Sequence, residues 1–504
     1  MTSARTALRD AVRAGRFFGA RHAAAAGALA EFLVERGAAD ALRAWFGDAA
    51  LREMLRRPDP MQRVGEALDR DIARLDALIS RQLDAVLHQP RLTRLEGSWR
   101  GLAWLTERAE ADRVIRIRLL PIRKPELSRD LERAVEFDQS ITFRKLHEEE
   151  FGIAGGEPYS LLLADFEVRP GPGGGDPVDD ISLLGRLAAT AAAAFCPILL
   201  PASPALLNLD SFGEASAAGD LAAALRAPDR ARWRALSTRE DTRFLGVVLP
   251  RALGRPAWRN DGTRADRFVY RERVAGDADR VWTAPIYAFA SNAVRAFRNF
   301  RWPGDLRGAE PSAVASGGVV EGLPLERLPS DPPGPPPRPP VELALTDEQE
   351  RALADANLIA FCGLDALPEA SFSALPTLHR PPRMTTEVAD ANQRLSAQMN
   401  NVLCVCRFAH CVKVMGRDMV GAFLSPEEVQ FRLMRWIGGY VSGLAGGGDA
   451  AARYPLRDAR VEVREQPGRP GTYGCVVHLQ PHHQLDDVGA VFRLVTDLSG
   501  PKPA

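Results

Sequence analysis

The sequence has no net charge and no long apolar run. Its 65 Lys and Arg residues balance 65 Asp and Glu residues, whereas nucleic-acid-binding proteins usually carry a basic excess. The two most apolar stretches are residues 181–204, which prolines interrupt, and residues 401–415, which contain Arg407 and are too short to span a bilayer. We therefore expect neither nucleic-acid binding nor membrane insertion.

Cysteine is also scarce, and the N-terminus lacks a recognisable export signal. The six cysteines are scattered and do not form the framework of a secreted disulfide-rich protein. No basic segment precedes an apolar core and a small-residue cleavage site, as a secretory signal requires. With 46% hydrophobic and 26% charged residues, the composition is that of an ordinary globular protein. We expect a cytoplasmic protein.

Motifs that would mark an enzyme are missing as well. The sequence contains no HExxH, GxSxG or Rossmann fingerprint. The glycine-rich run Gly171–Gly175 leads to Asp176 rather than to the lysine of a phosphate-binding loop, so we interpret it as a surface loop. The acidic run Glu148–Glu150 has no matching nucleophile and is interpreted as a solvated helix face. We predict no catalytic residue, and hence no enzyme.

The strongest metal candidates are Cys404, Cys406, His410 and Cys411. Thiolates and imidazoles bind zinc when they converge tetrahedrally, but here all four residues fall on one predicted helix and point to different faces. Buried structural thiols are the favoured interpretation, and a metal-binding or redox enzyme is the less favoured alternative. His482 and His483 would point to opposite faces of a strand end. We therefore expect no metal and no cofactor.

The first 88 residues read as helices. Residues 1–60 are rich in Ala, Arg and Leu and form a predicted helical N-terminal region. From residue 61 to 88, apolar residues recur at spacings of three and four, which predicts an amphipathic helix with a core or helix-pairing face. That stripe consists of Val64, Leu68, Ile72, Leu75, Ile79, Leu83, Val86 and Leu87.

Strands and helices alternate in the middle of the chain. We predict an alternating strand at Val114–Leu120, a charged helical region over residues 125–150 and a helix over residues 178–195. Buried strands are predicted at residues 160–166, 198–201 and 244–249. This alternation predicts a central α/β domain over residues 61–330. The run DPPGPPPRPP at residues 331–340 is interpreted as a linker or surface loop.

Residues 341–504 form the predicted C-terminal domain, with helices between residues 385 and 444 and strands at its end. A hairpin is predicted in which Val461 and Val463 on one strand face Tyr473, Val477 and Leu479 on the other, across a PGRPG turn. An isolated hairpin is marginal in water. Either an open edge accepts strands from neighbouring subunits, or residues 490–495 complete the sheet within the chain.

Three long stretches resemble the large sheath subunit of type VI secretion systems, the TssC, VipB or EvpB family. They are DAVLHQPRLTRLEGSWRGL from Asp84, LSRDLERAVEFDQSITFRKLHEEEFGIAGGEPYSLLLADFEV from Leu127, and YAFASNAVRAFRNFRWPGDLRG from Tyr287, which GGVVEGLP follows. Weaker similarity continues through RFAHCVKVMGRD and VEVREQPGRPGTYGCVVHLQPH. The resemblance spans about residues 61–500.

The resemblance implies a structural protein with a multi-domain, phage tail sheath-like fold of mixed α/β (α+β) class. Its implied partners are a small sheath subunit (TssB/VipA type), further copies of itself, an inner tube protein (Hcp type), a baseplate and an AAA+ unfoldase (ClpV type). Contraction of the sheath would propel the tube outward. A sheath-like adaptor or paralogue that never polymerises is the alternative.

Two groups of residues are candidates for assembly. In EGSWRGL, Gly97 and Gly101 permit a turn or a close approach, Trp99 is expected to be buried, and Glu96 and Arg100 can pair if helical. We interpret this motif as a helix–strand junction, with a subunit contact as the alternative. The family also implies that an N-terminal helix signals recycling; here the candidate is residues 6–18, whose apolar positions are Leu8, Val12 and Phe17.

Overall fold

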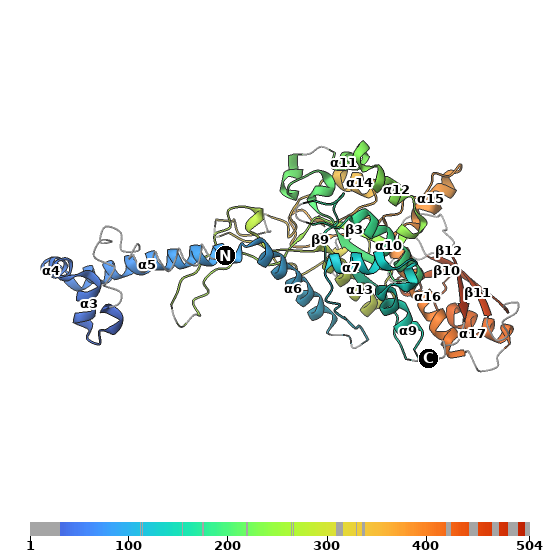
Figure 1. Cartoon of the computed structure of the whole chain (residues 1–504), viewed down its shortest axis with the longest axis horizontal. Helices are drawn as coiled ribbons and strands as arrows, with labels where there is room; N and C mark the ends of the chain where they lie inside the picture. Colours follow the sequence, from blue (N-terminus) through green and yellow to red (C-terminus); the bar gives the residue numbers. More distant parts are fainter. Residues whose placement is uncertain are drawn as a thin grey trace. The chain divides into compact units, whose positions relative to one another are not determined.

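A computed structural model of the chain divides into two compact units (Figure 1). Unit 1 comprises Met1–Glu96 and Arg255–Val281, and unit 2 comprises Gly97–Gly254 and Trp282–Ala504. The structure describes residues 31–110, 112, 114–153, 155–173, 176–217, 220–263, 265, 267–308, 316–328, 330–334, 338–419, 425–442, 452–465, 473–481 and 492–498.

Unit 1 is a helical unit around a small core. It contains α3 (Ala38–Phe46), α4 (Asp48–Arg56), α5 (Pro60–Leu87) and the beginning of α6 (Pro90–Ala109). The core consists of Phe46, Leu51, Val64 and Ala67. The predicted helix over residues 61–88 is confirmed by α5, which begins at a proline because an N-terminal position needs no backbone donor.

Most of the apolar stripe on α5 lies outside this core. Of the 28 residues of the helix, only Val64, Ala67 and Asp71 are buried. Ile72, Ile79 and Val86 expose 53%, 37% and 40% of their surface. Leu75, Leu83 and Leu87 are half-buried, so the stripe beyond the first turns is only partly covered by the described residues.

Unit 2 is built on a parallel sheet. Its four strands are β1 (Leu162–Leu163), β2 (Ile198–Pro201), β3 (Leu245–Leu249) and β7 (Ile359–Ala360), in the order β1-β2-β3-β7. All three pairings are parallel, and α10 (Asp180–Ala194) connects β1 to β2. The mixed α/β class predicted from the sequence is confirmed, as are the buried strands at residues 198–201 and 244–249. Of the buried strand predicted at residues 160–166, only Leu162–Leu163 form a strand, and both residues are half-buried.

The two faces of this sheet are buried in separate apolar clusters. Leu200 and Val247 pack in a cluster with side chains of α10, whereas Leu199 and Val248 pack in another with side chains of α13 (Pro285–Phe300). Because successive residues of a strand point to opposite faces, helices cover both sides of the sheet. That burial explains why the strands are continuous apolar runs in the sequence.

Shorter elements complete this part of unit 2. The helical ones are α7 (Lys124–Arg133), η2 (Phe137–Gln139), α8 (Ile141–Phe143), the π-helical turn η3 (Arg144–Glu148), α9 (Glu149–Phe151), η4 (Pro204–Leu207), η5 (Phe212–Ala217), α11 (Ala223–Arg226), η6 (Pro228–Arg230), α12 (Ala231–Ser237), η7 (Glu240–Phe244) and α14 (Asp347–Asp355). The strands are β4 (Ala252–Leu253), β5 (Trp282–Thr283), β6 (Val319–Val320), β8 (Cys362–Gly363) and β9 (Ala370–Ser371). The described part of the 255–281 segment of unit 1 has the turn η8 (Asp277–Asp279) and an antiparallel bridge between Arg259 and Arg271.

The C-terminal part of unit 2 packs helices on an antiparallel sheet. The helices are α15 (Glu387–Ser396), α16 (Met399–Met419) and α17 (Pro426–Gly438). The sheet has the order β10 (Leu456–Glu465), β11 (Tyr473–Pro481) and β12 (Phe492–Leu498), and α16 and α17 lie beside it (Figure 1). The predicted helices and the predicted hairpin strands are confirmed.

One predicted strand is wrong, and the domain boundaries stay predictions. Residues 114–120 form no strand, because no described strand pairs with them; the Ile115 N–H instead donates a 3.1 Å hydrogen bond to the Asp112 carbonyl across a turn. At the end of the proline-rich run, Val341 forms an antiparallel β-bridge with Ala252. The Pro340 carbonyl accepts a hydrogen bond from Leu253 N–H. The division into 1–60, 61–330, 331–340 and 341–504 is not tested by these contacts. No helix within the described ranges is long and apolar enough to cross a membrane.

Candidate functional site

The EGSWRGL motif lies inside helix α6 and not at a helix–strand junction. Its buried face is formed by Gly97, Gly101, Leu105 and Ala109, which recur every four residues and therefore share one side of the helix. The expectation that the glycines form a turn is wrong, because both lie within the helix, with helical residues before and after them. The alternative role, close approach of another segment, is the one that the structure shows.

Gly97 lies against β5, and Gly101 lies against β5 and the start of α13. A Cβ atom on Gly97 would lie 2.0 Å from the carbonyl oxygen of Trp282, and one on Gly101 would lie 2.3 Å from Thr283 Oγ1 and from the Tyr287 ring. The Tyr287 hydroxyl donates a 2.9 Å hydrogen bond to Asp165 Oδ2. Burial, and then the nearby Asp165 carboxylate, raise the pKa of Tyr287. The glycines therefore set how closely this part of α6 packs on β5 and α13.

Trp99 does not lie in the core, which corrects the expectation of burial. The side chain is 56% exposed, and Leu95, four residues earlier, is 55% exposed. These two residues lie on the side of α6 away from the glycine face, since they are offset from it by two residues, or about 200°. Arg100 is half-buried. The outward face of α6 thus presents two large apolar side chains to solvent.

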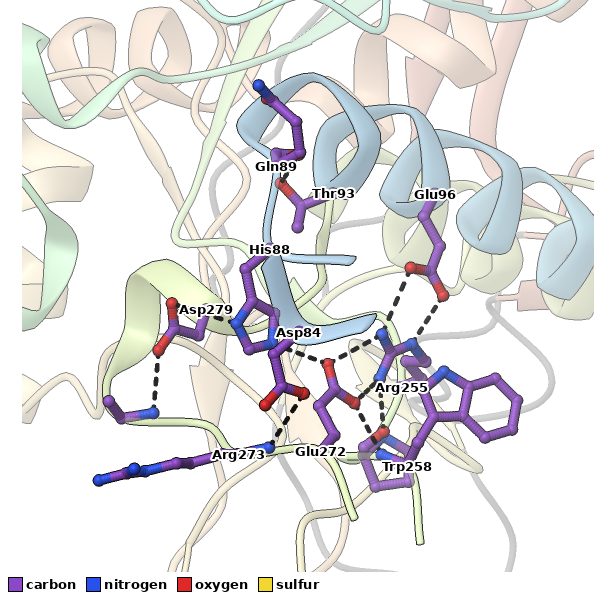
Figure 2. Close-up of polar contacts among 12 residues, drawn as sticks. Asp84, His88, Gln89, Thr93, Glu96, Arg255, Trp258, Glu272, Arg273 and Asp279 are labelled. Atoms are coloured by element: carbon purple, nitrogen blue, oxygen red, sulfur yellow. Dashed lines mark hydrogen bonds and ion pairs between the residues drawn. The ribbon is translucent and has the colours of Figure 1, made fainter. Parts of the chain in front are cut away.

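Glu96 belongs to a buried network of ion pairs in unit 1 (Figure 2). Arg255 Nε donates to Glu96 Oε1 at 2.6 Å, and Arg255 also binds both carboxylate oxygens of Glu272, at 2.5 and 3.1 Å. The Trp258 backbone N–H donates a further 2.7 Å bond to Glu272. Arg255 is therefore shared between an acidic residue of α6 and one of the 255–281 segment.

The network extends to the corner between α5 and α6. His88 follows α5 directly; its Nε2 lies 3.1 Å from Glu272 Oε1 and its Nδ1 lies 3.5 Å from Asp279 Oδ1. Near the end of α5, Asp84 accepts a 2.8 Å hydrogen bond from the Tyr270 hydroxyl. These contacts attach an otherwise irregular segment to the helical corner at three points.

Electrostatics favours the charged forms in this network. Burial opposes ionisation of Glu272, but the hydrogen bonds from Arg255 and from Trp258 N–H outweigh it and lower the pKa of this carboxyl. Burial likewise disfavours the charged guanidinium, yet the bonds to Glu272 and Glu96 raise the pKa of Arg255. Sequence reasoning found only Glu96, because its partners lie roughly 160 residues away and no local pattern marks them.

The C-terminal sheet buries the predicted face. Val461 lies opposite Val477, Leu479 opposite Ala459, and Val463 opposite Cys475. The valines and Leu479 expose 8% or less of their surface and pack with side chains of α16 and α17. Tyr473 begins β11, opposite Glu465, but its side chain lies outside the described residues.

β12 completes the hairpin within this chain. It pairs with β11 along its whole length, with Leu494 opposite Val477 and Leu498 opposite Tyr473. The expectation that β11 leaves an open edge for neighbouring subunits is therefore wrong. The alternative, a third strand supplied by the chain itself, is correct, although the strand is longer than the expected residues 490–495.

In the described part of the chain, Cys404 and His410 of α16 are buried and pack against neighbouring residues. Trp302 Nε1 lies 3.0 Å from Cys404 Sγ, and His410 Nε2 lies 3.3 Å from the Ala194 carbonyl. Burial raises the pKa of Cys404 to about 12, and burial lowers the pKa of His410 to about 3. No group of three or more metal-ligating side chains converges within the described ranges.

Two other sets of candidates cannot be placed. Leu8, Val12 and Phe17 lie outside the described residues, as do His482 and His483. The proposed recycling helix therefore stays a prediction from the sequence.

Comparison with known proteins identifies the class. Residues 69–379 match the model of the family described as EvpB/VC_A0108, tail sheath N-terminal domain, and residues 388–498 match its tail sheath gpW/gp25-like domain. The type VI secretion system sheath protein TssC1 of Pseudomonas aeruginosa is 34% identical over 445 residues, which cover 87% of each chain. These matches define a tail sheath protein.

Within that class, the chain belongs to the EvpB/VC_A0108 family, as the large subunit of a type VI secretion sheath. The resemblance seen in the sequence is confirmed, and neither alternative function gains support. The crystal structure of a sheath tail protein from Desulfitobacterium hafniense is 10% identical and covers 65% of this chain and 62% of its own, with a TM-score of 0.29. A score this low carries no weight for the fold.

Proposed function

We propose that this sheath subunit acts in the cytoplasm by pairing with a small sheath subunit of the TssB/VipA type, and that it catalyses no reaction. The pairs polymerise around an inner tube of the Hcp type, starting from a baseplate. Contraction of the lattice propels the tube, and an AAA+ unfoldase of the ClpV type then disassembles the sheath. Family membership supports the structural role; the individual partners are part of the proposal.

The exposed stripe on α5 is the observation that carries the pairing. Leu68, Ile72, Leu75, Ile79 and Val86 follow one another at spacings of four, three, four and seven residues, the pattern of a coiled-coil seam. Ile72, Ile79 and Val86 are nevertheless exposed in the single chain. A contiguous apolar stripe of this kind is typical of a protein–protein contact.

Charges beside the stripe indicate which charges the partner helix carries. Asp69 and Asp76 lie next to Ile72 and Ile79 on the same side of α5, and neither carboxylate has an ion-pair partner among the described residues. In coiled coils, charges beside the seam select partners of opposite sign. The stripe therefore fits a helix of the small subunit that carries apolar residues flanked by Lys or Arg.

Co-purification with the small subunit tests this pairing. Ile72→Asp with Ile79→Asp places two carboxylates in the seam, so the small subunit should no longer co-purify with the large one. Ala77→Asp is the matched control, since it adds the same group to an exposed position on another side of α5. Undiminished co-purification of the double variant would contradict the proposal. So would a monodisperse, stable large subunit expressed without any partner.

We also propose assembly roles for the remaining candidate residues. Trp99, with Leu95, provides a second apolar contact on α6, and the C-terminal sheet links neighbouring subunits through its outer strands β10 and β12. Residues 1–18 signal recycling. Deleting them should leave sheath assembly intact but stop disassembly by the unfoldase, and unchanged disassembly would contradict that role.

A further inference from the structure

Burial alternates along residues 267–273 of unit 1. Phe268 and Tyr270 are half-buried and Glu272 is buried, whereas the residues between and beside them are exposed. Alternate burial of this kind is typical of a segment with one covered side and one outward side. The exposed set, here named the arginine face, consists of Arg267, Val269, Arg271 and Arg273.

The covered side chains attach this segment to the corner between α5 and α6. The Tyr270 hydroxyl donates a 2.8 Å hydrogen bond to Asp84 near the end of α5, and Glu272 binds Arg255 through both carboxylate oxygens. These contacts occupy the covered side and leave the arginine face pointing away from them. Figure 2 shows the Arg273 guanidinium directed away from the ion-pair network.

The guanidinium groups of the arginine face have no counter-ion within the described ranges. No described residue forms an ion pair or a hydrogen bond with the side chain of Arg267, Arg271 or Arg273. The nearby described carboxylates are already engaged: Glu272 in the ion-pair network, and Asp261 by hydrogen bonds within its own turn. Residues 259–273 contain five arginines and three acidic residues, so this part of unit 1 carries an excess of positive charge.

Two of these arginines lie directly opposite each other. An antiparallel bridge aligns Arg259 with Arg271, and like charges at directly opposed positions are destabilising. A carboxylate supplied from outside the segment relieves that repulsion, and the guanidinium fork suits a carboxylate because it donates two parallel hydrogen bonds. Val269 and Trp258, which expose 44% and 48% of their surface, add apolar area. The surface therefore fits an acidic segment that also carries an apolar residue.

The small sheath subunit is the occupant that fits best. The arginine face belongs to the same compact unit as the α5 stripe. Its segment is bonded to Asp84, two residues before Val86 at the end of that stripe, so a chain bound along α5 is the nearest partner. The same segment of a second copy does not fit, because it would place arginine against arginine.

We propose that Arg267, Arg271 and Arg273 bind a cluster of Asp or Glu residues in the small sheath subunit. An apolar residue of that cluster covers Val269. This inference rests on the proposed pairing of the two subunits and assigns a second contact, apart from the α5 stripe, together with its charge.

The second contact also fixes how the small subunit lies on α5. The partner carries basic residues beside Asp69 and Asp76, as proposed above, and acidic residues beside the arginine face. A partner bound in the reverse direction would bring like charges together at both places. Charge complementarity of this kind selects the partner and its register more than it adds affinity.

Retention of the small subunit on an immobilised, co-expressed large subunit tests the proposal. Arg271→Glu with Arg273→Glu turns two attractions into repulsions, so this variant should retain on the order of tenfold less small subunit at low salt. The difference should shrink at high salt, because salt screens exposed charges. Arg36→Glu with Arg56→Glu is the matched control; it changes the net charge equally at exposed positions of unit 1 and should retain the wild-type amount.

Cross-linking gives an independent readout in a chain that keeps all of its arginines. A photo-cross-linker at position 269 should link to a peptide of the small subunit that contains Asp or Glu. Replacing those acidic residues with Lys should then restore retention by the variant with Glu at positions 271 and 273. Links to a second copy of the large subunit, to the inner tube protein or to nucleic acid would overturn the proposal.

The two levels of the inference fail in different ways. If the variant with Glu at positions 271 and 273 retains as much small subunit as wild type at low salt, the arginine face is not a contact, and the α5 pairing stands. A wild-type large subunit that never retains the small subunit overturns the pairing, and the arginine contact with it.

Discussion

Arg255 and Glu272 form a two-bond ion pair in which the side chains expose only 6% and 1% of their surface. The pair joins the irregular 255–281 segment to α6 through Glu96 and to the α5–α6 corner through His88 (Figure 2). Because α5 carries the proposed pairing stripe, this network fixes the base of that helix within unit 1.

Removing one partner of the pair should destabilise unit 1 strongly. Arg255→Met leaves Glu272 and Glu96 buried without their cation, so we expect the free energy of unfolding to fall by about 3–5 kcal/mol. Arg43→Met is the control; it breaks an exposed pair with Asp40 and should cost less than about 1 kcal/mol. Urea denaturation measures both, and equal small losses would show that the network contributes little.

The glycine face of α6 predicts opposite effects for two similar substitutions. Gly97→Ala places a methyl group against the Trp282 carbonyl, which should destabilise the chain by about 1–3 kcal/mol through backbone shifts. Gly65→Ala, also within a helix but with open space around it, should stabilise by roughly 0.5–1 kcal/mol. Thermal unfolding of the two variants should therefore shift in opposite directions. A shift of the same sign in both would contradict the close packing of α6.

Trp99 should matter for assembly more than for stability. Because its side chain is 56% exposed, Trp99→Ala should change the free energy of unfolding by less than about 1 kcal/mol. Trp233→Ala, at a site only 2% exposed, should cost about 3–5 kcal/mol. Sheath formation by the stable Trp99 variant should nevertheless decrease. Full-length sheaths from that variant would remove Trp99 from the subunit contacts.

His410 should contribute to acid sensitivity. Burial lowers its pKa from 6.5 to about 3, so the unfolded chain binds a proton that the folded chain does not. Its contribution is fully present above pH 6.5 and is lost as the pH falls towards 3. Between pH 7 and pH 5, wild type should lose about 2 kcal/mol more stability than His410→Gln. Denaturation curves at the two pH values measure this difference, and parallel pH dependence would contradict it.

The fold could be predicted where the hydrophobic pattern has one physical meaning. The apolar runs at residues 198–201 and 244–249 became strands because both faces of the sheet are buried. At residues 114–120 the alternation predicted a strand that the structure does not contain. A strand needs a neighbouring strand to pair with, and none of the described residues forms one beside this segment.

The candidate site was less predictable, because its partners are distant in the sequence. Glu96 was identified, but Arg255 and Glu272 were not, since no local spacing links α6 to the 255–281 segment. Trp99 was expected to be buried because large aromatic side chains usually are. In α6 the two glycines occupy the buried face instead, which leaves Trp99 on the opposite side.

Electron microscopy of the large subunit co-expressed with its small partner shows directly whether the two chains polymerise into a sheath. We predict regular tubular sheaths from the wild-type pair, and none from the pair that carries Ile72→Asp and Ile79→Asp in α5. Discrete, unpolymerised complexes from a wild-type pair that binds stably and remains soluble would contradict it, and would favour an adaptor that never polymerises.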